Sequence, residues 1–159
     1  RNVALKLNLS PQTHWILSSA SEVEQVLINL VMNASDAVSP EKNGLVTICT
    51  CNRRIQERCD LQTGALEPGD YVLLTIKDNG KGVDPSIIET LFDPFATTKD
   101  VGQGVGLGLS CVYGILKQAQ GEIQVKSRLG RGTQFDLYFP ALKKPRSSSK
   151  RTPSPAPQI

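Results

Sequence analysis

Residues Asp93 to Ser110 read D-P-F-A-T-T-K-D-V-G-Q-G-V-G-L-G-L-S and place four glycines, at every second position, just before a helix-forming run. Glycine allows a positive φ and a close approach of the backbone to a ligand. Beyond the glycines, apolar residues recur at three- and four-residue steps, which predicts an amphipathic helix. The free N–H groups and the dipole at a helix start attract phosphate. The stretch therefore predicts a phosphate-binding turn.

Two common glycine-rich motifs do not fit this stretch. A dinucleotide-binding fold has a strand directly before the first glycine, but Thr97, Thr98, Lys99 and Asp100 precede it here. A P-loop has Lys and then Ser or Thr after its last glycine, and Leu109 occupies that place. The function must therefore be sought in the rest of the chain.

The composition indicates one domain with a short tail. The chain has 159 residues, of which 39% are hydrophobic and 21% charged. We expect a folded domain at 1–142 and a disordered, basic Pro/Ser-rich linker at 143–159. The linker holds five of the 18 Lys and Arg, so 1–142 carries 13 basic and 15 acidic side chains, a net −2. A slightly acidic domain argues against nucleic-acid binding.

Three other features of the sequence indicate the cellular setting of the protein. No apolar run approaches the roughly 20 residues of a membrane span, so we expect a soluble domain without direct membrane contact. The chain starts at Arg1 rather than methionine, which suggests a piece of a longer protein. Its four cysteines have no C-x-x-C spacing, and we expect reduced thiols in a cytoplasmic protein.

The first third of the chain predicts a strand and a helix. Alternation over 3–9 predicts a half-buried strand. Ser21 and Glu24 form a capping box, so a helix should run from there to about Val38. Its apolar stripe packs on a core, while Ile28 and Met32 point away from it.

Polar residues flank the apolar stripe of this helix. Asn29, Asn33 and Asp36 follow one another at steps of four and three residues. Amides beside a buried stripe could face a ligand or a metal, although solvated polar residues would give the same pattern.

The middle and end of the chain predict further strands. Residues 45–54 and 71–77 read as strands, the second of them central, with a surface loop at 54–70 between them. The second strand delivers Asp78-Asn79-Gly80-Lys81-Gly82, which would place one carboxylate in a pocket or form a simple turn. A short helix should start at Asp84-Pro85 and run to Leu91. Residues 122–127 and 133–139 should form a hairpin.

Four segments, in this order, resemble the nucleotide-binding boxes of the catalytic domain of sensor histidine kinases. That domain is similar in fold to the ATPases of the gyrase, Hsp90 and MutL type. The four segments are Q-V-L-I-N-L-V-M-N-A-S-D-A, D-N-G-K-G-V, L-F-D-P-F-A-T-T-K and G-Q-G-V-G-L-G-L-S. The resemblance covers about 3–142. It implies an α+β two-layer sandwich, a Bergerat fold, with a mixed, mostly antiparallel sheet and about three helices on one face.

The resemblance also implies roles for individual residues. Asp78 and Thr133 would bind adenine, with Gly80 and Gly82 letting the base approach the backbone. Asn33 would hold Mg²⁺, and Asn29 would lie near the phosphates of ATP. Residues expected to act in catalysis are Asn29 and Lys99. The remaining expected contacts to the nucleotide are Asp36, Phe95, Thr97, Thr98, Lys99, Gly102, Gln103, Gly104, Val105, Gly106, Leu107 and Gly108.

One departure from the family limits what the piece can do alone. Kinases of this type phosphorylate a histidine in an H-E/D-x-x-x-P helix, and His14 does not match it. The expected partners are therefore a histidine-containing dimerisation domain elsewhere in the parent protein and a response regulator or receiver domain. A nucleotide-binding regulatory module without transfer and a serine kinase of the same fold are the alternatives. Gyrase-type relatives carry a glutamate where Asn29 stands, and an amide cannot take a proton from water, which favours transfer over hydrolysis.

Overall fold

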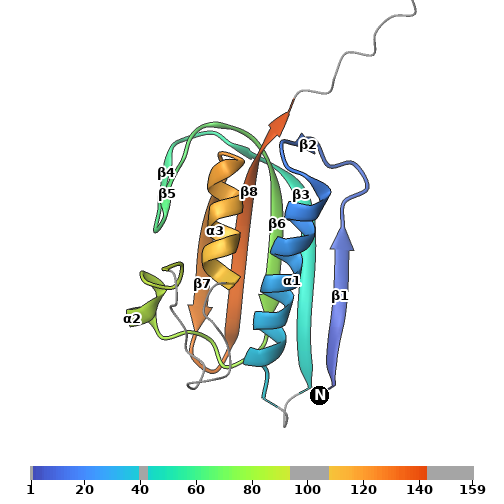
Figure 1. The fold of residues 1–159 in the computed structure, drawn as a ribbon, viewed down its shortest axis with the longest axis vertical. Helices are drawn as coiled ribbons and strands as arrows, with labels where there is room; N and C mark the ends of the chain where they lie inside the picture. Colours follow the sequence, from blue (N-terminus) through green and yellow to red (C-terminus); the bar gives the residue numbers. More distant parts are fainter. Residues whose placement is uncertain (1, 40–42, 94–107, 143–159) are drawn as a thin grey trace, which may run out of the picture.

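The structure, a computed structural model, describes residues 2–39, 43–93 and 108–142. Helices α1 (Ala20–Ala37) and α3 (Gly108–Gln118) cover one face of a mixed sheet, and α2 (Pro85–Ile88) is a single turn (Figure 1). The strands are β1 (Val3–Leu9), β2 (Trp15–Ile16), β3 (Gly44–Ile55), β4 (Cys59–Leu61), β5 (Gly64–Leu66), β6 (Gly69–Asp78), β7 (Glu122–Arg128) and β8 (Gly132–Leu142). The predicted α+β sandwich is confirmed. No helix in the described ranges is long and apolar enough to cross a membrane.

The sheet is organised around β6. The strand order is β1-β3-β6-β8, with β7 on the outer side of β8 and β2 against the end of β8. Among the strands of the described residues, β1 and β3 run parallel, and the other pairs of this sheet are antiparallel. β6 is thus the central strand that the apolar run at 71–77 predicts, and it ends at Asp78.

The core lies between the two long helices and the sheet. Val26 and Leu30 of α1 and Val112 and Leu116 of α3 are fully buried. They pack against the inner side chains of the sheet, which include Val46, Ile48, Ile76, Phe135, Leu137 and Phe139. Because burial of each such side chain contributes about 1.5–3 kcal/mol, this core fixes how the ends of α1 and β6 lie relative to each other.

The start of α1 differs from the prediction. Its N-cap is Ser19, whose hydroxyl accepts a hydrogen bond from Glu22 N at 3.2 Å while the Glu22 carboxylate accepts one from Ser19 N at 2.8 Å. The Ser21–Glu24 box is therefore wrong by two residues. The sequence contains two overlapping S-x-x-E patterns, Ser19 to Glu22 and Ser21 to Glu24. In the first, the Glu22 carboxylate also accepts a 2.8 Å hydrogen bond from the Ser18 hydroxyl.

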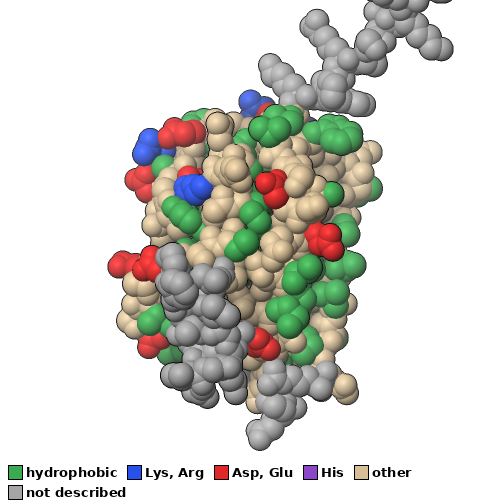
Figure 2. Space-filling model, in the orientation of Figure 1, with side chains coloured by type: hydrophobic (Ala, Val, Ile, Leu, Met, Phe, Trp, Pro, Cys, Tyr) green, Lys and Arg blue, Asp and Glu red, His purple; other side chains and the backbone are tan. Residues whose placement is uncertain are grey.

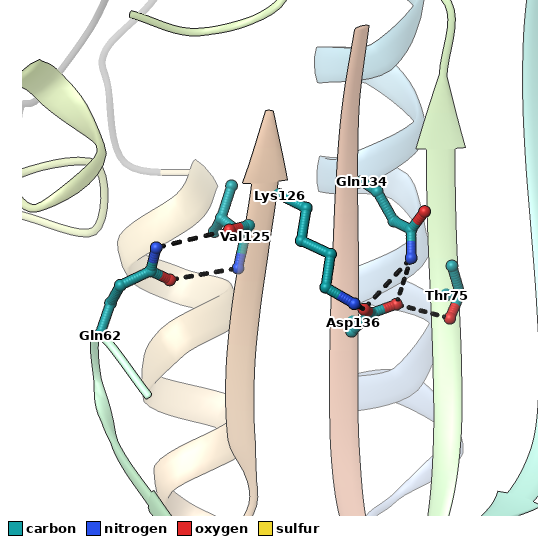
Figure 3. Close-up of polar contacts among 6 residues, drawn as sticks. All are labelled: Gln62, Thr75, Val125, Lys126, Gln134 and Asp136. Carbon is teal, nitrogen blue, oxygen red and sulfur yellow. Dashed lines mark hydrogen bonds and ion pairs between the residues drawn. The ribbon is translucent and has the colours of Figure 1, made fainter. Parts of the chain in front are cut away.

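The face of the sheet away from the helices carries a buried carboxylate (Figure 3). Asp136, only 2% exposed, accepts hydrogen bonds from Lys126 Nζ at 2.9 Å, Thr75 Oγ1 at 2.8 Å and Gln134 Nε2 at 3.0 Å. Burial alone would raise the pKa of Asp136, but these donors outweigh it and lower the pKa. The cluster joins β6, β7 and β8 across this face.

The segment at 54–70 is not the plain surface loop that its polarity predicts. It forms the β4–β5 hairpin, and the Gln62 side chain bonds both the N–H and the C=O of Val125 on β7, at 3.4 Å each (Figure 3). The side-chain amide of Gln62 thus forms hydrogen bonds with backbone groups that would otherwise be unpaired at the edge of the sheet. The hairpin also covers a second small core made of Leu66, Tyr71, Leu73 and Tyr138.

β1 also differs from the prediction. Leu5, Leu7 and Leu9 share one face of the strand, as the alternation predicts, but these side chains are 55%, 54% and 55% exposed rather than buried. Alternation fixes which side chains share a face, but not whether another element covers that face.

Candidate functional site

Helix α1 presents its polar flank toward the start of α3. Asn29 and Asn33 lie one turn apart and are half-buried, while Asp36 is exposed near the helix end. A Cβ at Gly108, the first residue of α3, would stand 3.6 Å from Asn29 Oδ1. The segment 94–107 therefore rejoins the described chain next to Asn29.

Asn29 holds a hydrogen-bond donor that the described residues do not use. Its Oδ1 accepts a bond from Gln25 Nε2 at 3.3 Å. Its Nδ2 is buried and has no partner in the described part of the chain. A buried, unpaired donor is costly, by about 1–3 kcal/mol, so it suits a ligand that brings acceptor oxygens.

Asp78 is the second polar group of the site. It is 5% exposed, and its Oδ1 accepts bonds from Gly80 N at 2.8 Å and Thr133 N at 3.3 Å. Burial raises the pKa of Asp78, and these two backbone donors counteract part of that effect. Because both bonds end on the same oxygen, the orientation of the carboxylate is fixed.

The glycine turn after Asp78 is clamped between α1 and the β7–β8 turn. A Cβ on Gly80 would lie 2.6 Å from Ala37 O, and Lys81 N donates to that same oxygen at 2.9 Å. Gly82 has φ +74°, and a Cβ there would meet Arg128 O. Both positions thus need glycine for protein backbone to pack against protein backbone, and Gly80 joins the turn to the end of α1 while Gly82 joins it to the β7–β8 turn.

The start of β8 completes this cluster. Thr133 is 5% exposed, and its hydroxyl lies 2.9 Å from Ser127 Oγ. Ser127 Oγ also accepts a bond from Val83 N at 2.8 Å, so it links β7 to the glycine turn. Sequence reasoning missed Ser127, because a serine within a strand gives no signal of such a contact.

The expected site residues thus fall into two groups. In the described chain, Asp78, Gly80 and Thr133 are in direct contact, and Gly80 also packs on the end of the helix that carries Asn29 and Asn33. Asp36 near the end of α1, Gly82 against the β7–β8 turn and Gly108 beside Asn29 are described as well. The remaining expected residues lie outside the described residues: Phe95, Thr97, Thr98, Lys99, Gly102, Gln103, Gly104, Val105, Gly106 and Leu107.

A ring contact joins Phe92, shortly before segment 94–107, to helix α3, which follows the segment. Phe92 stacks on Tyr113 of α3, with ring centroids 5.7 Å apart and an interplanar angle of 27°. Phe92 is 9% exposed and belongs to the main core. The chain therefore packs on the core on both sides of segment 94–107, at Phe92 before it and from Leu109 onward after it.

Comparisons with known proteins identify the family of this chain. The family described as histidine kinase-, DNA gyrase B-, and HSP90-like ATPase matches residues 18–143. The chain is 39% identical over 142 residues to the sensor kinase CckA of Brucella abortus (strain 2308), covering 89% of this chain and 15% of that protein. It is 33% identical over 143 residues to the sensor histidine kinase ZraS of Salmonella typhi, covering 89% of this chain and 27% of that protein.

A solved structure gives the same result for the fold. The catalytic domain of histidine kinase ThkA is 28% identical and superposes with a TM-score of 0.63, covering 88% of this chain and 80% of that one. The chain belongs to the family of histidine kinase-, DNA gyrase B-, and HSP90-like ATPases. Within it, the chain is an ATP-binding catalytic domain of the sensor histidine kinase type. It spans less than a third of the length of CckA and ZraS.

Proposed function

We propose that the chain binds Mg-ATP between α1, the end of β6 and segment 94–107, and that its parent protein uses this ATP to phosphorylate a histidine. The observation that carries the proposal is the presence of two unlike polar groups along α1, one on the helix and one on the turn that packs on its end. Asp78 offers an oriented acceptor, and Asn29 offers a buried donor without a partner among the described residues.

These two groups match the two ends of a nucleotide. The adenine amino group is a donor and would bind the second oxygen of Asp78, because Oδ1 is already occupied by two N–H groups. Phosphate oxygens are acceptors and would bind Asn29 Nδ2. Thr133 would share the adenine contact through its position beside Asp78.

The metal and the other phosphate contacts complete the proposal. Magnesium prefers oxygen ligands and would bind the side-chain oxygen of Asn33, together with phosphates and water, and would neutralise charge on the triphosphate. Lys99 and the backbone of the glycines from Gly102 to Gly108 would contact the phosphates. Phosphoryl transfer depends mainly on positioning and charge neutralisation, and these residue types supply both.

The acceptor is proposed to lie outside this chain. His14 is the single histidine of the sequence, it is exposed, and its backbone N donates to Asn52 Oδ1 at 2.8 Å. We place the acceptor on a dimerisation domain of the parent protein, with a response regulator or receiver domain as the next recipient, in the cytoplasm where ATP is available.

The test is phosphorylation of the full parent protein with ATP labelled at the γ-phosphate. We expect a label that is lost in acid, as phosphohistidine is. His14→Gln should keep the label, whereas Asn33→Ala should abolish it. An acid-stable label would instead show transfer to serine or a similar hydroxyl. Nucleotide binding without any label would show a regulatory module.

A further inference from the structure

The face of the sheet away from the helices carries a row of lysines. Lys6 of β1, Lys77 of β6 and Lys126 of β7 are all exposed. The register places them in one line across the sheet, with Thr47 of β3 between the first two and Gln134 of β8 between the last two. Paired residues of neighbouring strands point to the same face, so all three lysines project away from the helices. We call these three residues the lysine row.

The acidic side chains of this face are largely buried and already paired. In the strands that form the face they are Glu122 and Asp136, whose side chains are 15% and 3% exposed. Glu122 pairs with Lys117 of α3 at 2.6 Å, and Asp136 pairs with Lys126 at 2.9 Å. The other two lysines of the row have no ion pair within the described ranges. Their charges are therefore open to a partner molecule.

Charge is distributed unevenly over the domain. Residues 1–142 carry a net charge of −2, but Arg53 of β3 adds a further exposed positive charge to the face of the lysine row. On the helix-bearing face, by contrast, acidic side chains are spread from one end to the other, and Lys and Arg lie near one end (Figure 2). A positive surface on an acidic domain favours a negatively charged partner, because opposite charges speed association and fix the orientation of a complex.

We infer that the lysine row binds an acidic helix of a partner protein, a contact that does not depend on the nucleotide site. Neighbouring strands lie about 4.8 Å apart, so lysines on alternate strands are about 10 Å apart. Residues seven apart in a helix share one face and are separated by about 10.5 Å. Asp or Glu at i, i+7 and i+14 therefore meets the three lysines. An extended segment fits less well, because three residues, which span about 10 Å, turn successive side chains to opposite faces.

Lys126 is prepared for such a contact by the buried carboxylate beside it (Figure 3). Its Nζ donates to Asp136, which Thr75 and Gln134 hold in place, and yet its side chain is 56% exposed. An ammonium group has three donors, so two remain for a partner carboxylate. Because the lysine is already ordered, binding costs less side-chain entropy.

The same face is less suited to nucleic acid or to a membrane. Single-stranded nucleic acid stacks on exposed aromatic rings, but Tyr71 and Tyr138, the aromatic side chains of β6 and β8 on this face, are each 9% exposed. The β4–β5 hairpin covers both rings, so it projects beside the row and would hold a flat bilayer away. A helix, which is only about 10 Å wide, can lie along the row next to the hairpin.

Titration of a designed peptide into the chain tests the inference. The probe is a helical peptide with Glu at three positions seven residues apart, and fluorescence anisotropy in low salt measures its binding. Lys6→Glu combined with Lys77→Glu should weaken binding roughly tenfold or more, because two attractive pairs become repulsive. The matched control, Arg54→Glu combined with Arg131→Glu, changes the net charge equally at exposed positions off the row and should bind the peptide as the unaltered chain does. No binding, or an equal loss in both double variants, would overturn the inference.

Photocrosslinking of the full parent protein in its own cells gives an independent readout. A benzoylphenylalanine replaces Thr47, which lies between Lys6 and Lys77, and in the control it replaces Leu129, which is 58% exposed on the β7–β8 turn. We expect position 47 to crosslink to a partner protein, within a helix that has Asp or Glu seven residues apart, and position 129 not to do so. Adding Lys77→Glu should remove this crosslink. A crosslink to lipid, to nucleic acid, to the parent polypeptide or to a segment without this acidic spacing, or no crosslink, would overturn the inference.

Discussion

Replacing Asp78 with asparagine separates the role of this residue in binding from its role in stability. Both hydrogen bonds to the carboxylate come from backbone N–H groups and end on Oδ1. In Asp78→Asn the amide oxygen must stay in that position to satisfy the same donors. The amide nitrogen then takes the place of the second carboxylate oxygen and faces the adenine amino group, so donor meets donor.

The expected loss of affinity follows from this exchange. A hydrogen bond to a charged group contributes about 1.5–3 kcal/mol, which corresponds to a roughly 10- to 150-fold weaker Kd for ATP. Stability should move the other way. Because burial raises the pKa of Asp78, its charged form opposes folding more as the pH rises above the ordinary pKa of aspartate. At pH 7 the variant should therefore unfold at an equal or higher urea concentration than the unaltered protein.

Calorimetric titration with Mg-ATP and urea unfolding, both at pH 7, measure the two effects. Asp84→Asn is the matched control, because Asp84 is an exposed N-cap of α2 and asparagine caps a helix equally well. The control should bind ATP normally. An unchanged Kd for Asp78→Asn would refute the proposed adenine contact, and a clear loss of stability would refute the assigned cost of burial.

Three further substitutions, two of them with a matched control substitution, test the scaffold around the site by urea unfolding. Gly80→Ala should lower the free energy of unfolding by about 1–3 kcal/mol, because its Cβ would meet backbone at 2.6 Å. Gly114→Ala, whose Cβ would have no atom within 4 Å, should raise it by about 0.5–1 kcal/mol. Equal effects of the two substitutions would contradict the close packing of Gly80 on α1. Ser19→Ala should lose about 1 kcal/mol and Ser21→Ala almost nothing, and the reverse order would restore the cap predicted from sequence. Asp136→Asn should lower the free energy of unfolding by ~1–2 kcal/mol at pH 7; this loss is modest because the partner, Lys126, is exposed to solvent. The pKa of Asp136 is lower in the folded protein than the ordinary pKa of aspartate. The stability that its carboxylate contributes is therefore fully present above the ordinary pKa and should vanish as the pH falls through the folded pKa. A difference in stability between the two proteins that does not change with pH would contradict this assignment.

The sequence predicted the central parts of the fold because local patterns determine them. The apolar run at 71–77, the amphipathic stripe of α1 and the Asp84-Pro85 helix start each depend on neighbours in the chain, and β6, α1 and α2 confirm them. The helix at Asp84 ends earlier than predicted, at Ile88 rather than Leu91.

Other features depend on residues far apart in the sequence and could not be predicted from a local pattern. The hairpin at 59–66 is held against β7 by Gln62 and the neighbouring Thr63, whose partners lie about 60 residues away in the sequence. Exposure of β1 depends on what covers it, which alternation does not encode. The site shows both cases. Asp78 at the end of β6 followed from the pattern, whereas the packing of Gly80 on Ala37 and the bond from Val83 to Ser127 required the structure.

We propose above all that Asp78 and the two asparagines of α1 bind opposite ends of one nucleotide. A crystal structure of the chain with Mg²⁺ and a non-hydrolysable ATP analogue tests it most directly. We predict the adenine amino group within hydrogen-bond distance of the Asp78 carboxylate and the metal beside Asn33. A nucleotide bound elsewhere, or one that leaves Asp78 without contact, would contradict the account.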